Sequence, residues 1–131
     1  MIKKKIYYYD TDAQGIVNNG SYLDYMEEAR TEYIEKECEI NFQKLQYEQN
    51  VLFVVYKHEI EYKYPARFGE TLNIECSILD ISDIKIEVEY KFTNQEDKLT
   101  TKAKTVLVCV NKEGSPIMIP GDVKDKLSKQ I

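Results

Sequence analysis

The strongest constraint on the fold is a run of strict alternation at residues 84–92, which reads IKIEVEYKF. Every second residue in this run is apolar, and a charged residue stands between each pair. A period of two predicts a β-strand that buries one face and turns the other to water. Strands of this kind belong to antiparallel sheets with one covered face. The chain must therefore supply neighbouring strands and an element that covers the apolar side.

Four further segments have strand character. These predicted strands are 2–9, 51–64, 71–81 and 103–111. The apolar run VLVCV within the last of them predicts a strand covered on both faces. TNQEDK at 93–98 predicts a hairpin turn, and YPARFGE at 64–70 breaks the chain between two strands. Because short turns join antiparallel neighbours, we expect one antiparallel sheet of about five strands.

The covering element is predicted to be one long helix of about four turns. Residues at i, i+4, i+7 and i+11 form its apolar face, namely Tyr22, Met26, Ala29 and Tyr33. Three polar residues at its start are candidate N-caps: Asn18, Asn19 and Ser21. A short helix is expected at 41–49, and the tail at 116–131 has a weak helical pattern. The elements predict an α+β fold in which residues 1–131 form a single domain, with the sheet wrapped around the long helix.

Composition excludes several classes of function. The net charge of −5 leaves no excess of Lys and Arg for a nucleic-acid surface. No window approaches the ~18 consecutive apolar residues of a membrane span, and no signal-peptide core follows the N-terminus. We therefore expect a cytoplasmic protein with no membrane partner. Three widely spaced cysteines without a CxxC pair predict reduced thiols in the core and no metal site.

The segment YYYDTDAQGIVNNGSYLDYMEEAR at 7–30 carries the most specific chemistry. Asp10 and Asp12 stand two residues apart, just before the predicted helix start. Acidic residues are ordinary in turns, where their side chains bond local backbone. Carboxylates beside a helix N-terminus are also a way to build a site for an electrophile, because the free N–H groups there attract developing negative charge.

This segment resembles the signature of the hotdog-fold acyl-CoA thioesterases of the 4-hydroxybenzoyl-CoA thioesterase-like family. That signature is an aromatic strand, D-x-D-x-x-G-x-V, a polar link and a helix that contains E-x-A-R. The matching residues here are Asp10, Asp12, Gly15, Val17, Tyr22, Glu27 or Glu28, Ala29 and Arg30. A second segment, YKYPARFGETLNIE at 62–75, resembles the family's P-x-x-x-G-D-x-L, with Glu70 in place of the usual Asp. The resemblance spans nearly the whole chain and implies the hotdog fold.

The resemblance implies hydrolysis of an acyl-CoA thioester to a free acid and coenzyme A. Asp12 would be the catalytic nucleophile or general base, and backbone N–H groups near Asn19 would polarise the thioester carbonyl. Arg67 and Lys85 are the candidates for the phosphates of coenzyme A. The other expected substrate-binding residues lie around the helix start: Gly15, Ile16, Val17, Asn18 and Tyr22. No cofactor is implied, since coenzyme A is part of the substrate.

Several residues also have purely structural interpretations. Asp10 is expected to bond local backbone, and Tyr22 lies on the apolar helix face. Glu27, Glu28 and Arg30 are expected to form an ion pair at the end of the helix. His58, the only histidine, is expected to be half-buried with its hydrogen bonds satisfied. Hydratases of this fold use a histidine for acid–base chemistry, so hydrolysis is favoured over hydration.

The sequence departs from the family in one respect and leaves two other functions open. Many relatives carry histidine at the positions of Ile16 or Asn19, and this chain has none there. The alternatives are a non-catalytic acyl-CoA-binding or sensor domain, and a thioesterase that acts on acyl carrier protein. A sheet wrapped on one helix leaves open strand edges, so we expect a homodimer or homotetramer.

Overall fold

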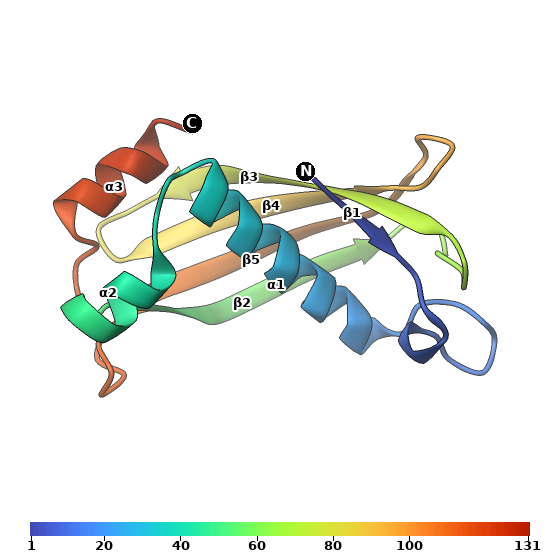
Figure 1. Cartoon of the computed structure of the whole chain (residues 1–131), viewed down its shortest axis with the longest axis horizontal. Coiled ribbons are helices and arrows are strands. Elements are labelled where there is room, and N and C mark those ends of the chain that lie inside the picture. Colours follow the sequence, from blue (N-terminus) through green and yellow to red (C-terminus); the bar gives the residue numbers. More distant parts are fainter.

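The computed structural model describes residues 1–131 and contains five strands and three helices (Figure 1). The strands are β1 (Ile2–Lys5), β2 (Leu52–Tyr62), β3 (Thr71–Ile81), β4 (Lys85–Thr93) and β5 (Leu99–Val110). The helices are α1 (Asn19–Lys36), α2 (Phe42–Gln49) and α3 (Gly121–Ser128), and a 3₁₀ turn, η1, spans Tyr8–Asp10. All five strands form one antiparallel sheet in the order β1-β3-β4-β5-β2.

The long helix α1 lies across one face of this sheet, as the sequence predicts (Figure 1). Its 18 residues make about five turns, which is somewhat more than the expected four. The inward face of β4 confirms the alternation, because Ile86, Val88, Tyr90 and Phe92 are all almost completely buried. Val88 on β4 and Met26 on α1 belong to a single core of 25 buried residues. This is the α+β, helix-on-sheet arrangement of the hotdog fold.

One expectation about strand neighbours is wrong. β2 and β3 are consecutive in the sequence but lie far apart in the sheet, because β2 pairs with β5. The loop at 63–70 does not join the two strands as a hairpin. Its backbone bonds instead to residues 15–17, where Val17 N–H donates to Ala66 O at 2.9 Å and Phe68 N–H donates to Gly15 O at 3.0 Å. The tight connections β3–β4 and β4–β5 do join neighbours, as expected.

The first strand is shorter than predicted. It ends at Lys5, and the tyrosines at 7–9 leave the sheet and enter η1. The cause is local, because the Asp10 carboxylate accepts the Tyr7 N–H at 3.0 Å and the Asp10 N–H donates to Tyr7 O at 3.0 Å. These bonds fold the backbone into a turn. Tyr8 and Tyr9 are consequently about three quarters exposed.

The remaining predicted elements are present, although β5 begins at Leu99 and not at residue 103. Leu45 of α2 and Val123 and Leu127 of α3 are buried, and four consecutive residues at 107–110 of β5 are buried as well. All three cysteines are free thiols; Cys38 and Cys109 are buried and Cys76 is half-buried. No helix here combines the length and the apolar surface needed to cross a bilayer.

Candidate active site

The segment 11–17 forms a small hairpin that carries Asp12. Thr11 and Val17 make an antiparallel bridge, and Asp12 N–H donates to Ile16 O at 2.9 Å. Gly15 N–H closes the turn on Asp12 O at 3.0 Å. Gly15 has φ of 76°, a left-handed conformation that side chains other than glycine rarely adopt. The glycine of the motif is therefore required by the turn itself.

The hairpin is held against the loop that follows β2. Ile16 makes an antiparallel bridge with Arg67, between the Val17–Ala66 and Phe68–Gly15 bonds described above. Val17 and Ala66 are buried, so this contact belongs to the core. The two segments that resemble the family signature thus meet in space, although about fifty residues separate them in the sequence.

Asp10 has a structural environment. It is 5% exposed, its carboxylate accepts the Tyr7 N–H, and its backbone carbonyl accepts the Asn18 N–H at 2.9 Å. The phenol of Tyr25 is its neighbour, and burial together with the Asp10 carboxylate raises the pKa of that phenol. The bond to Tyr7 is the local backbone contact that was expected, and the bond from Asn18 also ties Asp10 to the start of α1.

Asp12 has the opposite environment. Its side chain is exposed to solvent, and its Oδ1 accepts the Gln14 N–H at 2.8 Å. The other carboxylate oxygen, Oδ2, has no hydrogen-bond partner in the chain. One oxygen therefore orients the side chain, while the second is free for a water molecule or a substrate carbon.

The start of α1 supplies free donors beside this hairpin. Asn18 is the N-cap, and its side chain accepts the Ser21 N–H at 2.9 Å. The backbone N–H groups of Asn19 and Gly20 have no acceptor in the chain, and both residues are exposed. The helix macrodipole adds positive potential at this end. These two N–H groups can stabilise an oxyanion.

Two other residues expected near the substrate have side chains that are half-buried or almost completely buried. Ile16 is half-buried. Tyr22 is only 2% exposed and packs edge to face against Tyr62 and Phe92, with ring centroids 5.2 and 5.5 Å away. Burial is the main cause of the raised pKa of the Tyr22 phenol. The structure therefore gives Tyr22 a role in the core.

The two basic candidates for phosphate binding lie at different ends of the sheet. Arg67 is exposed beside the hairpin, and its guanidinium has no partner. Lys85 begins β4, and its Nζ lies 4.8 Å from the ring centroid of Tyr56. The part of β4 from Lys85 to Phe92 is about 23 Å long. Phe92 packs on Tyr22 near the start of α1, so this length separates Lys85 from that end of the helix. One chain does not bring Lys85 to Asp12.

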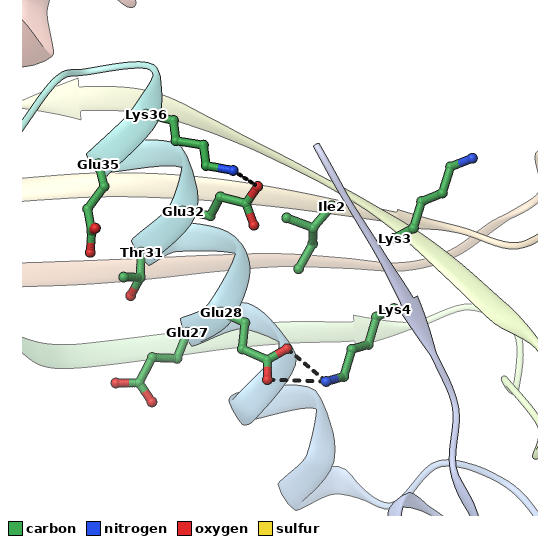
Figure 2. Close-up of a pocket in the computed structure, with 9 residues that line it drawn as sticks. All are labelled: Ile2, Lys3, Lys4, Glu27, Glu28, Thr31, Glu32, Glu35 and Lys36. Atoms are coloured by element: carbon green, nitrogen blue, oxygen red, sulfur yellow. Dashed lines mark hydrogen bonds and ion pairs between the residues drawn. The ribbon is translucent and has the colours of Figure 1, made fainter.

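A separate hollow lies between β1 and the outer side of α1 (Figure 2). It is lined almost entirely by charged side chains, among which Lys4 pairs with Glu28 at 3.1 Å and Lys36 with Glu32 at 2.9 Å. The expected ion pair of Glu27 or Glu28 with Arg30 is therefore wrong. Glu28 faces β1, whereas Arg30 points to the inner side of the helix.

Arg30 is the residue whose environment the sequence analysis missed. It is 8% exposed, and its Nη1 donates to the Tyr90 hydroxyl at 2.9 Å. No carboxylate lies within 4.0 Å of it. The helical spacing contained the signal, because Arg30 follows Met26 by four residues and so shares its buried face.

Comparison with known proteins shows what this chain resembles. The sequence model of the Thioesterase-like superfamily matches residues 7–127. The acyl-CoA thioester hydrolase YbgC of Escherichia coli O6:H1 is 36% identical over 107 residues, which cover 82% of this chain and 78% of that protein. The acyl-CoA thioesterase YbgC of Haemophilus influenzae is 32% identical over 123 residues, covering 92% and 88%. The solved structure of the probable thioesterase YbaW of Escherichia coli superposes with a TM-score of 0.84 at 26% identity, covering 99% and 97%.

Proposed function

Because the chain belongs to the thioesterase-like superfamily, we propose that it is an acyl-CoA thioesterase that hydrolyses an acyl-CoA thioester to a free acid and coenzyme A. The proposal rests on one observation. A free carboxylate oxygen of Asp12 and two free backbone N–H groups at the start of α1 lie within one short stretch of the chain. The names of the relatives from Escherichia coli and Haemophilus influenzae support the substrate class. The reaction needs no cofactor, since coenzyme A enters as part of the substrate.

In the proposed mechanism the thioester carbonyl lies between Asp12 and the start of α1. The carbonyl oxygen accepts the N–H groups of Asn19 and Gly20, which stabilise the negative charge that forms on it. One such donor is typically worth about 2.7–4 kcal/mol in the transition state. In one route Asp12 attacks the carbonyl carbon, the thiolate of coenzyme A leaves, and water then hydrolyses the resulting mixed anhydride to the free acid and the Asp12 carboxylate. In the other route Asp12 takes a proton from the water that attacks the carbonyl carbon, and the thiolate leaves. Gly15, Val17 and Asn18 shape the backbone around the reacting group.

The proposed enzyme is a homo-oligomer, at least a dimer. Asp12 and the helix start are exposed in one chain, yet oxyanion donors act best where water is excluded. β2 is an open edge of the sheet, and it carries the exposed apolar residues Val54 and Val55. Antiparallel pairing of β2 with its copy would place the Lys85 end of one chain near the Asp12 end of the other. Arg67 and Lys85 from two chains would then share the phosphates of coenzyme A.

Acyl-CoA is a metabolite of the cytoplasm, where we expect the protein to act.

The test is replacement of Asp12 with Asn, which keeps the size and the Gln14 hydrogen bond but removes both nucleophile and base. We expect kcat for acyl-CoA hydrolysis to fall at least ~100-fold, with little change in KM. The matched control is Asp80→Asn, which neutralises an exposed carboxylate on β3. Steady-state thiol release and thermal melts are measured for both variants.

A normally folded Asp12→Asn protein that keeps most of its turnover would remove Asp12 from the mechanism. A wild-type protein that binds acyl-CoA without hydrolysing it would be a sensor domain. Activity that appears only with acyl carrier protein as donor would identify the third function that the sequence left open.

A further inference from the structure

A buried positive charge on α1 has no anion to balance it. Arg30 is 8% exposed, and its one hydrogen bond in the chain goes to a neutral hydroxyl, that of Tyr90. Removing a charged group from water costs several kcal/mol unless it is paired. A guanidinium carries five N–H donors, and a bidentate carboxylate is the partner that fits them best. The position of Arg30 is therefore incomplete in the chain alone.

The neighbours of Arg30 form a polar cluster that contains no acid. Tyr90 and Thr105 are completely buried, and the Thr105 Oγ1 lies 2.9 Å from Nδ1 of His58. Burial lowers the pKa of His58, and the charge of Arg30 lowers it further, so the histidine stays neutral. The half-buried thiol of Cys76 is another neighbour; burial raises its pKa to about 12, which Arg30 partly opposes. None of these groups supplies a negative charge near neutral pH.

Arg30 also forms part of the wall of an open hollow between α1, α2 and β2. Half of the residues in the wall are apolar, namely Phe42, Val51, Leu52, Phe53 and Leu107, and Thr31 and Gln46 add uncharged polar groups. Glu27 and Glu35 stand at the rim, where they are exposed and water screens their charge. A hollow whose wall is half apolar and contains one buried cation suits a ligand that has an apolar stretch and ends in an anion.

This hollow lies along α1 from the candidate active site. Leu23, Glu27 and Arg30 follow one another at i, i+4 and i+7, so they share one flank of the helix. The helix rise places Arg30 about 16 Å from Asn19, at whose N–H the thioester carbonyl would bind. Figure 1 shows α1 running from the loop at its start across the sheet towards β3, where a connecting segment turns back to α2. The hollow itself begins at Glu27, so an acyl chain bound at the helix start would follow this flank past Leu23 to reach the guanidinium.

We propose that Arg30 is a specificity residue that binds a carboxylate at the far end of the acyl group, so that the preferred substrates are monothioesters of dicarboxylic acids with coenzyme A. This inference rests on the proposed thioesterase function. Within it, Asp12 and Asn19 act on the thioester, and Arg30 recognises the distal end of the chain that the enzyme releases.

The experiment compares acyl-CoA pairs of equal length that differ only at the far end. Dodecanedioyl-CoA against dodecanoyl-CoA is the main pair, and adipoyl-CoA against hexanoyl-CoA tests whether the chain must be long enough to reach Arg30. A hydrogen bond to a charged group is worth about 1.5–3 kcal/mol, so kcat/KM for the long diacid should exceed that of its methyl-terminated partner by about 10- to 100-fold. The short pair should show a smaller ratio.

Variants then assign the preference to the side chain. Arg30→Met keeps the length of the side chain and removes its charge, so the ratio for the long pair should fall to about 1. Arg30→Lys keeps the charge without the bidentate geometry and should retain part of the preference. Lys104→Met, which removes a positive charge from the opposite face of the sheet, is the control and should keep the wild-type ratio.

The outcomes separate this inference from the proposed function. Hydrolysis of both long substrates at equal kcat/KM by the wild type would overturn the role of Arg30 and leave the thioesterase intact. An Arg30→Met protein that loses activity on both substrates in the same proportion would also overturn it, since the residue would then be structural. If the wild type hydrolysed no thioester at all, the proposed function and this inference would fail together.

Discussion

Two residues of the same type, two positions apart, have different environments in this protein. Asp10 is buried and bonded to the backbone on both sides of the hairpin, while Asp12 is exposed with one free oxygen. The difference arises because the turn of η1 points one carboxylate inward and leaves the other on the hairpin tip. Burial and hydrogen bonding, and not residue type, thus separate the structural acid from the proposed catalytic one.

His58 leads to a prediction about pH and stability. Its pKa lies below the ordinary 6.5 because of burial and then of Arg30. The unfolded chain therefore binds a proton more readily than the folded chain as the pH falls below about 6.5, and stability decreases there. We expect His58→Asn, measured by urea unfolding at pH 7.5 and 5.5, to lose less stability on acidification than the wild type. An equal loss of stability in the two proteins would show that groups other than His58 cause the decrease at low pH.

The sequence predicted the chemistry of single residues where local contacts decide it. The half-buried, hydrogen-bonded state of His58 followed from its place on a strand and is confirmed by the contact with Thr105. Arg30 was misjudged because a charged residue was assumed to seek the nearest acid along the helix. Its Tyr90 partner lies sixty positions away, which no local pattern reveals.

At the scale of elements, the two N-caps allow a matched test. Asn18 caps α1 through the Ser21 N–H at 2.9 Å, and Asn41 caps α2 through the Lys44 N–H at 3.0 Å. Replacing either with Ala should cost about 1 kcal/mol of stability. Only Asn18→Ala should also lower kcat, because it loosens the helix start that holds the proposed oxyanion donors. Thermal melts and steady-state kinetics check both effects, and an equal loss of kcat in Asn41→Ala would point to stability alone.

Element boundaries were predictable where capping or alternation is local. The range of β3, the buried face of β4 and the start of α1 agree with the sequence, since each depends on neighbouring residues. The placement of β2 was not predictable in this way. It pairs with β5, and the 63–70 loop that follows it bonds to the Asp12 hairpin; both contacts join segments far apart in the chain.

At the scale of the whole molecule, the two edges of the sheet differ. β1 is a short edge of four residues, whereas β2 presents eleven residues with no strand on its outer side. A lysine on an open edge opposes pairing with another strand. We expect Val55→Lys to shift the protein towards monomer and to lower kcat/KM together. The control is Met118→Lys, at an exposed apolar residue in the segment between β5 and α3, which lies on no strand. Light scattering coupled to size-exclusion chromatography measures the molar mass, and kcat/KM is measured on the same fractions. A wild-type protein that is monomeric and fully active would contradict the proposed dimer.

The order of strands also governs how the chain can fold. Ile2 pairs with Ile74 and Leu52 with Val110, so each edge strand must wait for a partner made much later. Contacts of such sequence separation slow folding and keep apolar strands unpaired during synthesis. The Asp12 hairpin follows β1 and rests on the loop after β2, so its geometry depends on both edge strands of the sheet. In a refolding experiment, catalytic activity should therefore return no earlier than the last strand joins the sheet.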